Sequence, residues 1–181
     1  MEASYINSHA DIIERCLAGS RSAQNDLYKQ YSKAMLNISY RISNDRDDAE
    51  DILQESFISA FRNLKSYRGT ASFGAWLKRI VVNKAINHIR KKSLALVPLE
   101  GSEHIIDEPI EDMELVLKVD KIKEAVQMLP DGYRVVFSLY LLEGYDHKEI
   151  AEILGISEST SKSQFNRSKK KLLELLKQEN E

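Results

Sequence analysis

The stretch DHKEIAEILGISESTSKSQFNRSKKKL, residues 146–172, predicts two helices joined by a tight turn. Asp146 and Glu149 have the spacing of a reciprocal helix N-cap. Gly155 can adopt the left-handed backbone conformation that turns the chain sharply, and Ser157 can cap the longer helix that follows. Two helices joined by a glycine-containing turn of this length are typical of a helix-turn-helix.

The second of these helices has an apolar face and a polar, cationic face. Steps of three and four residues define a stripe that we expect to be buried: Ser161, Phe165, Ser168, Leu172 and Leu176. The candidate DNA contacts on the other side are Ser159, Thr160, Lys162, Ser163, Asn166, Arg167 and Lys170. Arg and Asn can read base edges in the major groove while Lys and Ser hold phosphates, so this face predicts binding to duplex DNA. The alternative is an amphipathic helix whose polar face only meets water.

Charge is segregated along the chain, although the formal net charge of the 181 residues is only −2. Residues 44–55 hold six acidic side chains and one cation, residues 60–92 hold nine cations and no acid, and residues 99–114 hold seven acids and no Lys or Arg. Solvated helix faces usually interleave both signs. Two basic surfaces divided by an acidic segment therefore indicate two contacts with one polyanion.

The hydrophobic periodicity predicts an all-α protein with two helical domains joined by an acidic flexible linker. The expected helices cover about 9–18, 22–41, 45–64, 73–92, 116–128, 131–144 and the two helices of the opening stretch. Asp45 and Asp131 are expected to cap the two helices that begin at these residues. The linker, 95–114, contains two of the three prolines and breaks the periodicity. The expected domains are therefore 1–94 and 115–181.

Several protein classes are disfavoured by the sequence. No apolar run approaches the roughly 18 residues of a membrane-spanning helix, and no secretory signal is visible, so we expect a cytoplasmic protein without membrane insertion. The single cysteine, Cys16, excludes an internal disulfide and is expected to be a packed thiol. The four histidines lack metal-ligand spacing, so no metal and no cofactor is expected. An enzyme is disfavoured because no nucleophile with a base and no glycine-rich phosphate cradle is found.

The basic segment KSYRGTASFGAWLKRIVVNKAINHIRKK, residues 65–92, mixes aromatic side chains with cations and amides. Aromatic rings can stack on unpaired bases while cations neutralise the backbone, as is typical of surfaces that bind single-stranded nucleic acid. The candidate contacts are Lys65, Tyr67, Arg68, Phe73, Trp76, Arg79, Asn83, Asn87 and Arg90. The loop 65–72 could hold an extruded base. The alternative for Trp76 is core packing, and we expect at least part of its ring to be packed.

An acidic surface is expected on the helix that precedes this basic segment. Its candidate contacts are Asp48, Glu50, Asp51, Gln54 and Glu55. Such a surface repels nucleic acid and suits a protein partner that carries Arg or Lys. The alternative is that these side chains are only solvated.

Three segments together resemble bacterial RNA polymerase sigma factors of the small extracytoplasmic-function (ECF) type, within the sigma-70 family. They are DAEDILQESFISAFRNL (48–64), YRGTASFGAWLKRIVVNKAINHIRKK (67–92) and LPDGYRVVFSLYLLEGYDHKEIAEILGISESTSKSQFNRSKKKL (129–172). The resemblance covers residues 10–176 apart from the linker. The joint occurrence of the three motifs in this order is specific, whereas the helix-turn-helix alone is not.

The resemblance implies a promoter-specificity factor that performs no chemistry and whose partners are core RNA polymerase, promoter DNA and an anti-sigma protein. Residues 1–94 correspond to sigma region 2. This region docks on the coiled coil of the polymerase β′ subunit through the acidic surface, and it recognises and melts the −10 element with residues 65–90. Residues 115–181 correspond to region 4, which binds the −35 element as duplex and touches the flap of the β subunit. The linker of the family passes through the polymerase toward its active site.

A free-standing repressor or activator is the rival interpretation. It predicts tight operator binding by the isolated protein, usually as a dimer, and leaves the acidic surface and the loop 65–72 unexplained. The sequence also departs from the family in the second helix of the helix-turn-helix. Many relatives have Gly-Thr-Val where this chain has Ser159, Thr160 and Ser161. A serine in a slot that is normally apolar predicts slightly weaker packing of this helix, and Gln164 and Asn166 leave the promoter preference open.

Overall fold

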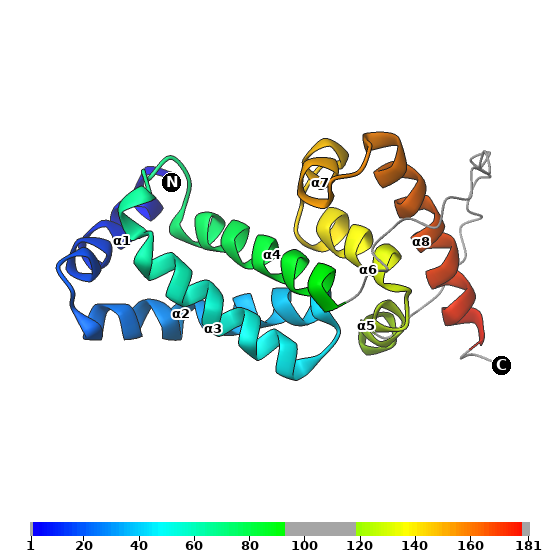
Figure 1. Ribbon diagram of the computed structural model, residues 1–181, viewed down its shortest axis with the longest axis horizontal. Helices are drawn as coiled ribbons and strands as arrows, with labels where there is room; N and C mark the ends of the chain where they lie inside the picture. Colours follow the sequence, from blue (N-terminus) through cyan, green and yellow to red (C-terminus); the bar gives the residue numbers. More distant parts are fainter. Residues whose placement is uncertain (1, 93–118, 179–181) are drawn as a thin grey trace. The chain divides into compact units, whose positions relative to one another are not determined.

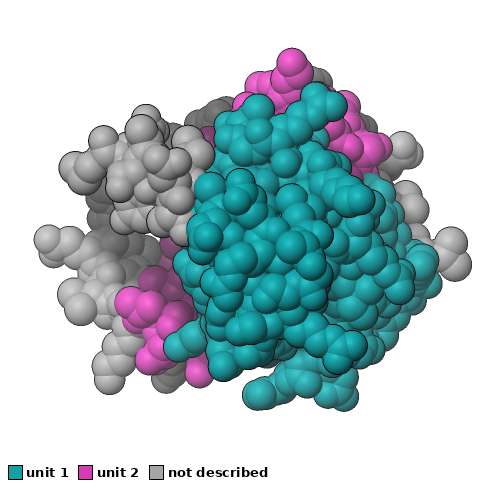
Figure 2. Space-filling model, turned by 90° about the vertical axis from the view of Figure 1, so that its left-hand side faces the viewer, with its two compact units in different colours: residues 1–92 teal, residues 93–181 magenta. Residues whose placement is uncertain are grey.

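The structure, a computed structural model, describes residues 2–92 and 119–178 (Figure 1). Within these two ranges the chain forms helices and no strand, which confirms the all-α prediction. The chain divides into two compact units, Met1–Lys92 and Ser93–Glu181, which are coloured separately in Figure 2. The predicted linker, 95–114, lies outside the described residues. No helix in the described ranges is long and apolar enough to cross a membrane.

Unit 1 consists of four α-helices and one short 3-10 helix. They are α1 (Glu2–Leu17), α2 (Arg21–Ser43), α3 (Arg46–Arg62), η1 (Leu64–Ser66) and α4 (Phe73–Lys92). The expected Asp45 cap of α3 is confirmed, because Asp45 Oδ1 accepts a hydrogen bond from Asp48 N at 2.9 Å. The helix α2 ends at Asn44, whose φ of 57° lies in the left-handed region that Asn tolerates.

The core of unit 1 lies between α2, α3 and α4, each of which packs against the other two. Leu27, Ile52 and Leu77, one from each helix, are buried at its centre. Two buried hydroxyls in this core keep hydrogen bonds: Ser39 Oγ donates to Met35 O at 3.0 Å and Ser56 Oγ donates to Ile52 O at 2.6 Å. Cys16 is buried, which confirms the prediction of a packed thiol.

Within residues 119–178, unit 2 consists of α5 (Val119–Gln127), α6 (Asp131–Phe137), η3 (Ser138–Leu142), α7 (His147–Leu154) and α8 (Glu158–Gln178). Two features differ from the sequence prediction. Asp131 does not cap α6, because Pro130 occupies the N-cap position and the Asp131 carboxylate instead accepts a hydrogen bond from Arg134 Nη2 at 2.7 Å. The helix predicted to reach Gly144 changes at Ser138 into a π-helix, a wider turn that the apolar periodicity does not reveal.

The helix-turn-helix formed by α7 and α8 has the predicted local structure. The reciprocal cap is complete: Glu149 N donates to Asp146 Oδ1 at 2.8 Å, and Asp146 N donates to Glu149 Oε2 at 2.9 Å. Gly155 ends α7 with a φ of 66°. Ser157 Oγ accepts a hydrogen bond from Thr160 N at 3.0 Å and so caps α8. All five residues of the predicted stripe on α8 are buried, and this face packs against α6 and α7.

Candidate nucleic-acid interface

The helix α4 in unit 1 presents the predicted polar face to solvent. Arg79, Asn83, Asn87 and Arg90 are all exposed, at intervals of three or four residues. The buried side chains Leu77, Val81, Val82, Ala85, Ile86 and Ile89 attach the helix to the core. Because α4 is packed against the core, its exposed polar side chains project from one side of a helix that is fixed in position.

A cluster of aromatic rings lies at the start of α4. Phe73 is 1% exposed, and its ring centroid lies 5.3 Å from that of Tyr31, 5.8 Å from that of Tyr67 and 5.6 Å from that of Trp76. Tyr67 and Trp76 are partly exposed and lie 5.4 Å apart, so the expected partial packing of Trp76 is confirmed. Phe73 was predicted as a DNA contact, but its ring is buried and instead packs against the partly exposed rings of Tyr67 and Trp76.

The loop before α4 is held by its own polar contacts. Tyr67 Oη donates a hydrogen bond to Ala71 O at 2.7 Å, and burial raises the pKa of Tyr67 so that the hydroxyl keeps its proton. Ser72 Oγ accepts a hydrogen bond from Ala75 N at 3.2 Å, in the first turn of α4. Lys65 and Arg68 are exposed beside the aromatic cluster. This loop therefore places two cations next to two partly exposed rings.

The acidic surface on α3 is formed by four exposed side chains, Glu50, Asp51, Gln54 and Glu55. Two of them have ion pairs at the edges: Glu50 Oε1 lies 3.2 Å from Arg46 Nε, and Glu55 Oε2 lies 3.5 Å from Lys84 Nζ. Ile58, which sequence reasoning did not select, is 50% exposed and follows Gln54 by one helical turn. The signal was available, because Ile58 is an apolar residue outside the buried stripe of this helix.

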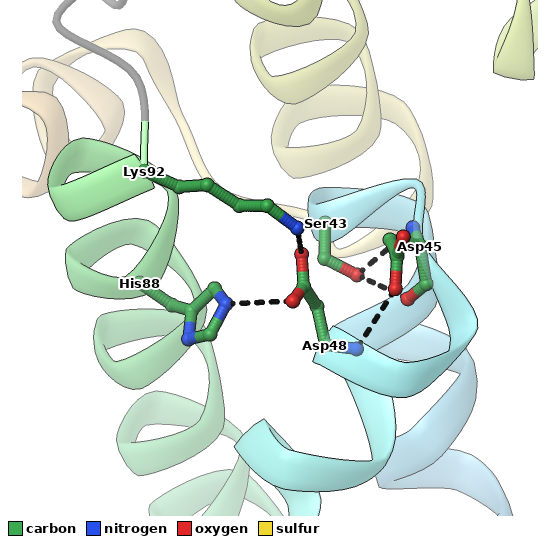
Figure 3. A network of polar contacts seen from close by, with 5 residues as sticks. All are labelled: Ser43, Asp45, Asp48, His88 and Lys92. Atoms are coloured by element: carbon green, nitrogen blue, oxygen red, sulfur yellow. Dashed lines mark hydrogen bonds and ion pairs between the residues drawn. The ribbon is translucent and has the colours of Figure 1, made fainter.

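Asp48 does not share the position of these four residues (Figure 3). One carboxylate oxygen lies 2.6 Å from Lys92 Nζ and the other lies 3.1 Å from His88 Nε2, so the side chain is directed toward α4 and is 16% exposed. The hydrogen bond from Lys92 is the main cause that lowers the pKa of Asp48, with a further contribution from His88. Asp48 thus joins the first turn of α3 to the last turns of α4.

The helix α8 in unit 2 carries the second set of candidate contacts. Ser159, Lys162, Ser163 and Lys170 are exposed, whereas Thr160, Asn166 and Arg167 are half-buried. The hydroxyls of the first turn are joined: Ser157 Oγ lies 2.9 Å from Ser159 Oγ and 2.7 Å from Thr160 Oγ1. Lys162 Nζ lies 2.7 Å from Glu158 Oε1. The structure therefore brings all seven predicted residues together on one helix, beside its buried stripe.

Ser161, the unusual serine of this helix, has a partner that sequence reasoning missed. Its hydroxyl is completely buried and lies 2.9 Å from Nδ1 of His147, the first residue of α7. The His147 ring is stacked on Tyr140 with centroids 4.4 Å apart and an interplanar angle of 12°. The prediction that Ser161 weakens the packing of this helix took only apolar contacts into account. No local spacing in the sequence connects residues that are 14 positions apart, so the partner of Ser161 could not be predicted.

A helix-turn-helix in one unit and a basic, aromatic helix face in the other define a class of protein: a two-unit, all-α nucleic-acid-binding protein. Comparison with known proteins agrees with this class. The profile of Sigma-70 region 2 matches residues 27–94, and that of Sigma-70, region 4 matches residues 120–172. The chain belongs to the sigma-70 family of RNA polymerase sigma factors, in the ECF type. It is therefore a transcription initiation factor that directs RNA polymerase to promoters.

Individual relatives show the extent of the similarity. The chain is 30% identical over 170 residues to the ECF RNA polymerase sigma factor SigM of Mycobacterium tuberculosis, covering 93% of this chain and 85% of the relative. It is 31% identical over 177 residues to the ECF RNA polymerase sigma factor SigW of Bacillus subtilis, covering 91% and 95%. Among solved structures, the sigma factor RpoE in complex with the anti-sigma factor NepR from Bartonella quintana matches with a TM-score of 0.56 at 24% identity, covering 84% of this chain and 96% of that one. This structural likeness shows the fold alone.

Proposed function

We propose that the two units of this sigma factor read two promoter elements in different states. The helix α8 reads the −35 element as duplex DNA, and the aromatic cluster with α4 binds the −10 element as a melted strand. The acidic surface on α3 docks on core RNA polymerase. The observation that carries the proposal is a pair of partly exposed rings, Tyr67 in the loop before α4 and Trp76 on α4. Trp76 continues the helical spacing of the exposed residues Arg79, Asn83, Asn87 and Arg90.

Stacking on the rings of Tyr67 and Trp76 favours a melted strand. Base–aromatic stacking stabilises a complex by about 1–3 kcal/mol per base, while opening a base step costs about 1 kcal/mol or somewhat more. Two rings, Tyr67 and Trp76, can therefore offset the unstacking of a few base steps when the cations of α4 also neutralise phosphates. These contacts favour the open strand over duplex, because in duplex DNA the base faces are covered by their neighbours.

The side chains of α8 and their packed support are suited to reading duplex DNA. An α-helix fits the major groove, where Arg and Asn can form paired hydrogen bonds with base edges. Asn166 and Arg167 are half-buried beside the buried stripe, and the exposed Ser163 and Lys170 are suited to phosphates. Short hydroxyl side chains in the first turn of α8 allow the helix to approach the groove floor closely.

The docking surface is the group of exposed residues Glu50, Asp51, Gln54 and Glu55 on α3. Its charge suits a cationic partner, and by family resemblance we assign this partner as the coiled coil of the β′ subunit. Ile58 lies one turn beyond Gln54 and adds an exposed apolar side chain to the surface. Asp48, predicted as a fifth contact, has both carboxylate oxygens paired within unit 1, so we assign it the role of holding α3 against α4.

Two further partner contacts complete the proposal. Region 4 of this chain touches the β flap, as the family resemblance implies. An anti-sigma protein holds the factor inactive, by analogy with the similarly folded RpoE, whose structure was solved with the anti-sigma factor NepR.

Transcription with purified bacterial core enzyme tests the proposal as a whole. We expect the purified chain to confer selective start sites on the core enzyme, and sequencing of the transcripts should reveal two shared upstream elements. Permanganate footprinting should detect unpaired thymines in the downstream element only. Tight, polymerase-independent operator binding without selective starts would support the repressor or activator interpretation instead.

The docking surface is tested by charge reversal. Glu50→Lys should weaken association with core polymerase by about tenfold or more, because like charges across an interface cost several kcal/mol. Asp26→Lys, which reverses an exposed acid on α2, is the matched control and should leave association unchanged. Equal association of the wild type and Glu50→Lys in a pull-down would contradict the assignment of this surface.

A further inference from the structure

We propose that His147 is a positioning residue for promoter reading: its hydrogen bond to Ser161 sets the orientation of the first turns of α8 against the DNA. The inference rests on the proposed function, in which α8 reads the −35 element. It adds a residue that lies on α7, outside the reading helix, and that is not among the candidate DNA contacts identified above.

The position of Ser161 makes its orientation consequential. Ser161 is in the fourth position of α8 and is completely buried, and the two residues on either side of it in the sequence are four of the seven candidate DNA contacts: Ser159, Thr160, Lys162 and Ser163. A helix turns by about 100° per residue, so the direction of one side chain fixes the directions of its neighbours. A bond that holds Ser161 therefore also holds Lys162 and Ser163 in direction.

The other end of this bond is itself fixed. The His147 ring is stacked on Tyr140 of η3, and its centroid lies 5.7 Å from that of Phe165, which belongs to the buried stripe of α8. Tyr140 also packs on Phe165 with centroids 4.5 Å apart. His147 is thus held by contacts with both η3 and α8 while its Nδ1 lies 2.9 Å from Ser161 Oγ. The contact joins three elements of unit 2, whereas an apolar residue at either position would supply packing without direction.

The surroundings of the ring favour a neutral imidazole. In the tautomer with its proton on Nε2, Nδ1 accepts a hydrogen bond from the Ser161 hydroxyl. Protonation turns Nδ1 into a donor, which reverses the direction of the bond, and adds a positive charge that the charge of Lys162 on α8 opposes. Burial and the charge of Lys162 lower the pKa of His147, against the opposing charges of Glu158 on α8 and Asp146 at the cap of α7. The reading of the upstream element should therefore weaken on acidification.

The test uses holoenzyme reconstituted from the full chain and bacterial core polymerase, with promoter fragments randomised in the upstream element. Discrimination is measured as the enrichment of the best-bound upstream sequences divided by the average enrichment of all bound sequences. Denaturant unfolding of the free chain measures its stability. Ser161→Ala and His147→Phe should each lower discrimination by about tenfold, because the bond is lost while the ring or the helix remains. The double variant should lose no more than either single variant, since both remove the same bond.

Ser168→Ala is the matched control. Ser168 is also completely buried in α8, but its hydroxyl donates to Phe165 O in the same helix at 2.7 Å. It should therefore lower stability without changing discrimination. His147→Asn keeps a hydrogen-bonding atom close to the Nδ1 position and cannot ionise near neutral pH. It should retain discrimination and abolish the fall expected for the wild type as the pH drops below 6.5.

The outcomes separate the inference from the proposed function. If the wild-type holoenzyme shows no upstream preference at all, the proposed function itself fails. If the wild type discriminates and both Ser161→Ala and His147→Phe discriminate equally well, the positioning role is overturned. An equal loss of discrimination in Ser161→Ala and Ser168→Ala would also overturn the positioning role, because the loss of discrimination would then follow from lower stability alone.

Discussion

The two units hold their DNA-facing helices by different chemistry. In unit 1 the end of α4 is tied to α3 by surface contacts of the Asp48 carboxylate with Lys92 and His88. In unit 2 the start of α8 is tied to α7 by a part-buried hydrogen bond between His147 and Ser161. Surface ion pairs are screened by salt and are lost when the carboxylate is protonated, whereas a hydrogen bond between neutral groups responds little to salt and is reversed when the imidazole is protonated.

The difference follows what each helix is proposed to do. A helix that stacks on a flexible melted strand can tolerate small adjustments, because every base offers a face to a ring. A helix that reads base edges must hold its side chains at hydrogen-bonding distance, so small rotations remove contacts. The contact that does not depend on an ion pair is found in the unit that we propose reads duplex DNA.

The largest expected effect comes from removing the buried support of the ring pair in unit 1. Phe73→Ala should lower the free energy of unfolding of this unit by about 3–5 kcal/mol, because a fully buried ring and its packing are lost. The single tryptophan, Trp76, lies in unit 1, so its fluorescence during denaturant unfolding reports this unit. The exposed Thr70, in the loop before α4, provides the control Thr70→Ala, for which we expect the free energy of unfolding to change by no more than about 0.5 kcal/mol.

The second effect compares how the two helices bind DNA. Arg167→Ala should reduce discrimination at one position of the upstream element by about 1–3 kcal/mol, because a paired contact with a base edge is lost. Trp76→Ala should instead weaken binding to the melted strand for all sequences alike. Both effects can be measured by competition among promoter variants. A uniform loss for Arg167→Ala would contradict direct base reading by α8.

Lys170→Ala separates phosphate contacts from base contacts on α8. Lys170 is exposed on the candidate DNA face. Its removal should weaken binding to all upstream sequences similarly and should lower the slope of log K against log salt by about 1. A titration of holoenzyme binding with salt measures this slope. A change of base preference with an unaltered slope would place Lys170 at a base rather than at a phosphate.

The next effect concerns the charged contact of unit 1. Asp48→Asn should lower the free energy of unfolding by about 1 kcal/mol at low salt, since the pairing is partly exposed. The difference from the wild type should shrink as salt is raised, when the pair is screened. Tryptophan fluorescence again reports the unit. A difference that stays constant with salt would show that the contact acts through hydrogen bonding rather than through charge.

The smallest effects distinguish the units by pH. The pKa of His147 is lowered from 6.5, so the folded state binds its proton less well than the unfolded state, and the stability of unit 2 should fall as pH drops below that value. The pKa of Asp48 is lowered from 3.8, so its contribution is present above that value and is lost only as pH falls through the folded pKa. Both effects can be measured by unfolding followed by circular dichroism. Comparison of the wild type with His147→Asn isolates the loss of stability caused by protonation of His147. Comparison with Asp48→Asn isolates the loss caused by protonation of Asp48.

Local structure was predictable wherever neighbours in the sequence decide it. The reciprocal cap of Asp146 and Glu149, the turn at Gly155 and the buried stripe of α8 all involve residues within one helix or one turn, and all three predictions were confirmed. The prediction of Asp131 as a cap was wrong, because Pro130 takes that position and the nearby Arg134 attracts the carboxylate. The π-helix at Ser138–Leu142 was also missed, since apolar spacing does not reveal a wider turn.

The candidate site likewise contains features that helical spacing predicts and features that depend on contacts with other helices. Exposure of the α4 face and of the four residues of the acidic surface on α3 agrees with their helical spacing. Helical spacing alone also placed Asp48 with the acidic residues and Phe73 with the DNA contacts. The carboxylate of Asp48 meets α4, and the ring of Phe73 is covered by Tyr31 from α2, so helices distant in sequence changed the position of both side chains.

The amino-acid sequence by itself determined the helices, their caps, the helix-turn-helix and the separation of charge, because these depend on side chains a few residues apart. Only the tertiary structure decided which polar groups are paired across helices. Asp48 lies 44 residues from Lys92, and His147 lies 14 residues from Ser161. Such pairs form because packing an apolar face of one helix against another brings their polar neighbours within hydrogen-bonding distance, and no periodicity within a single helix records that distance.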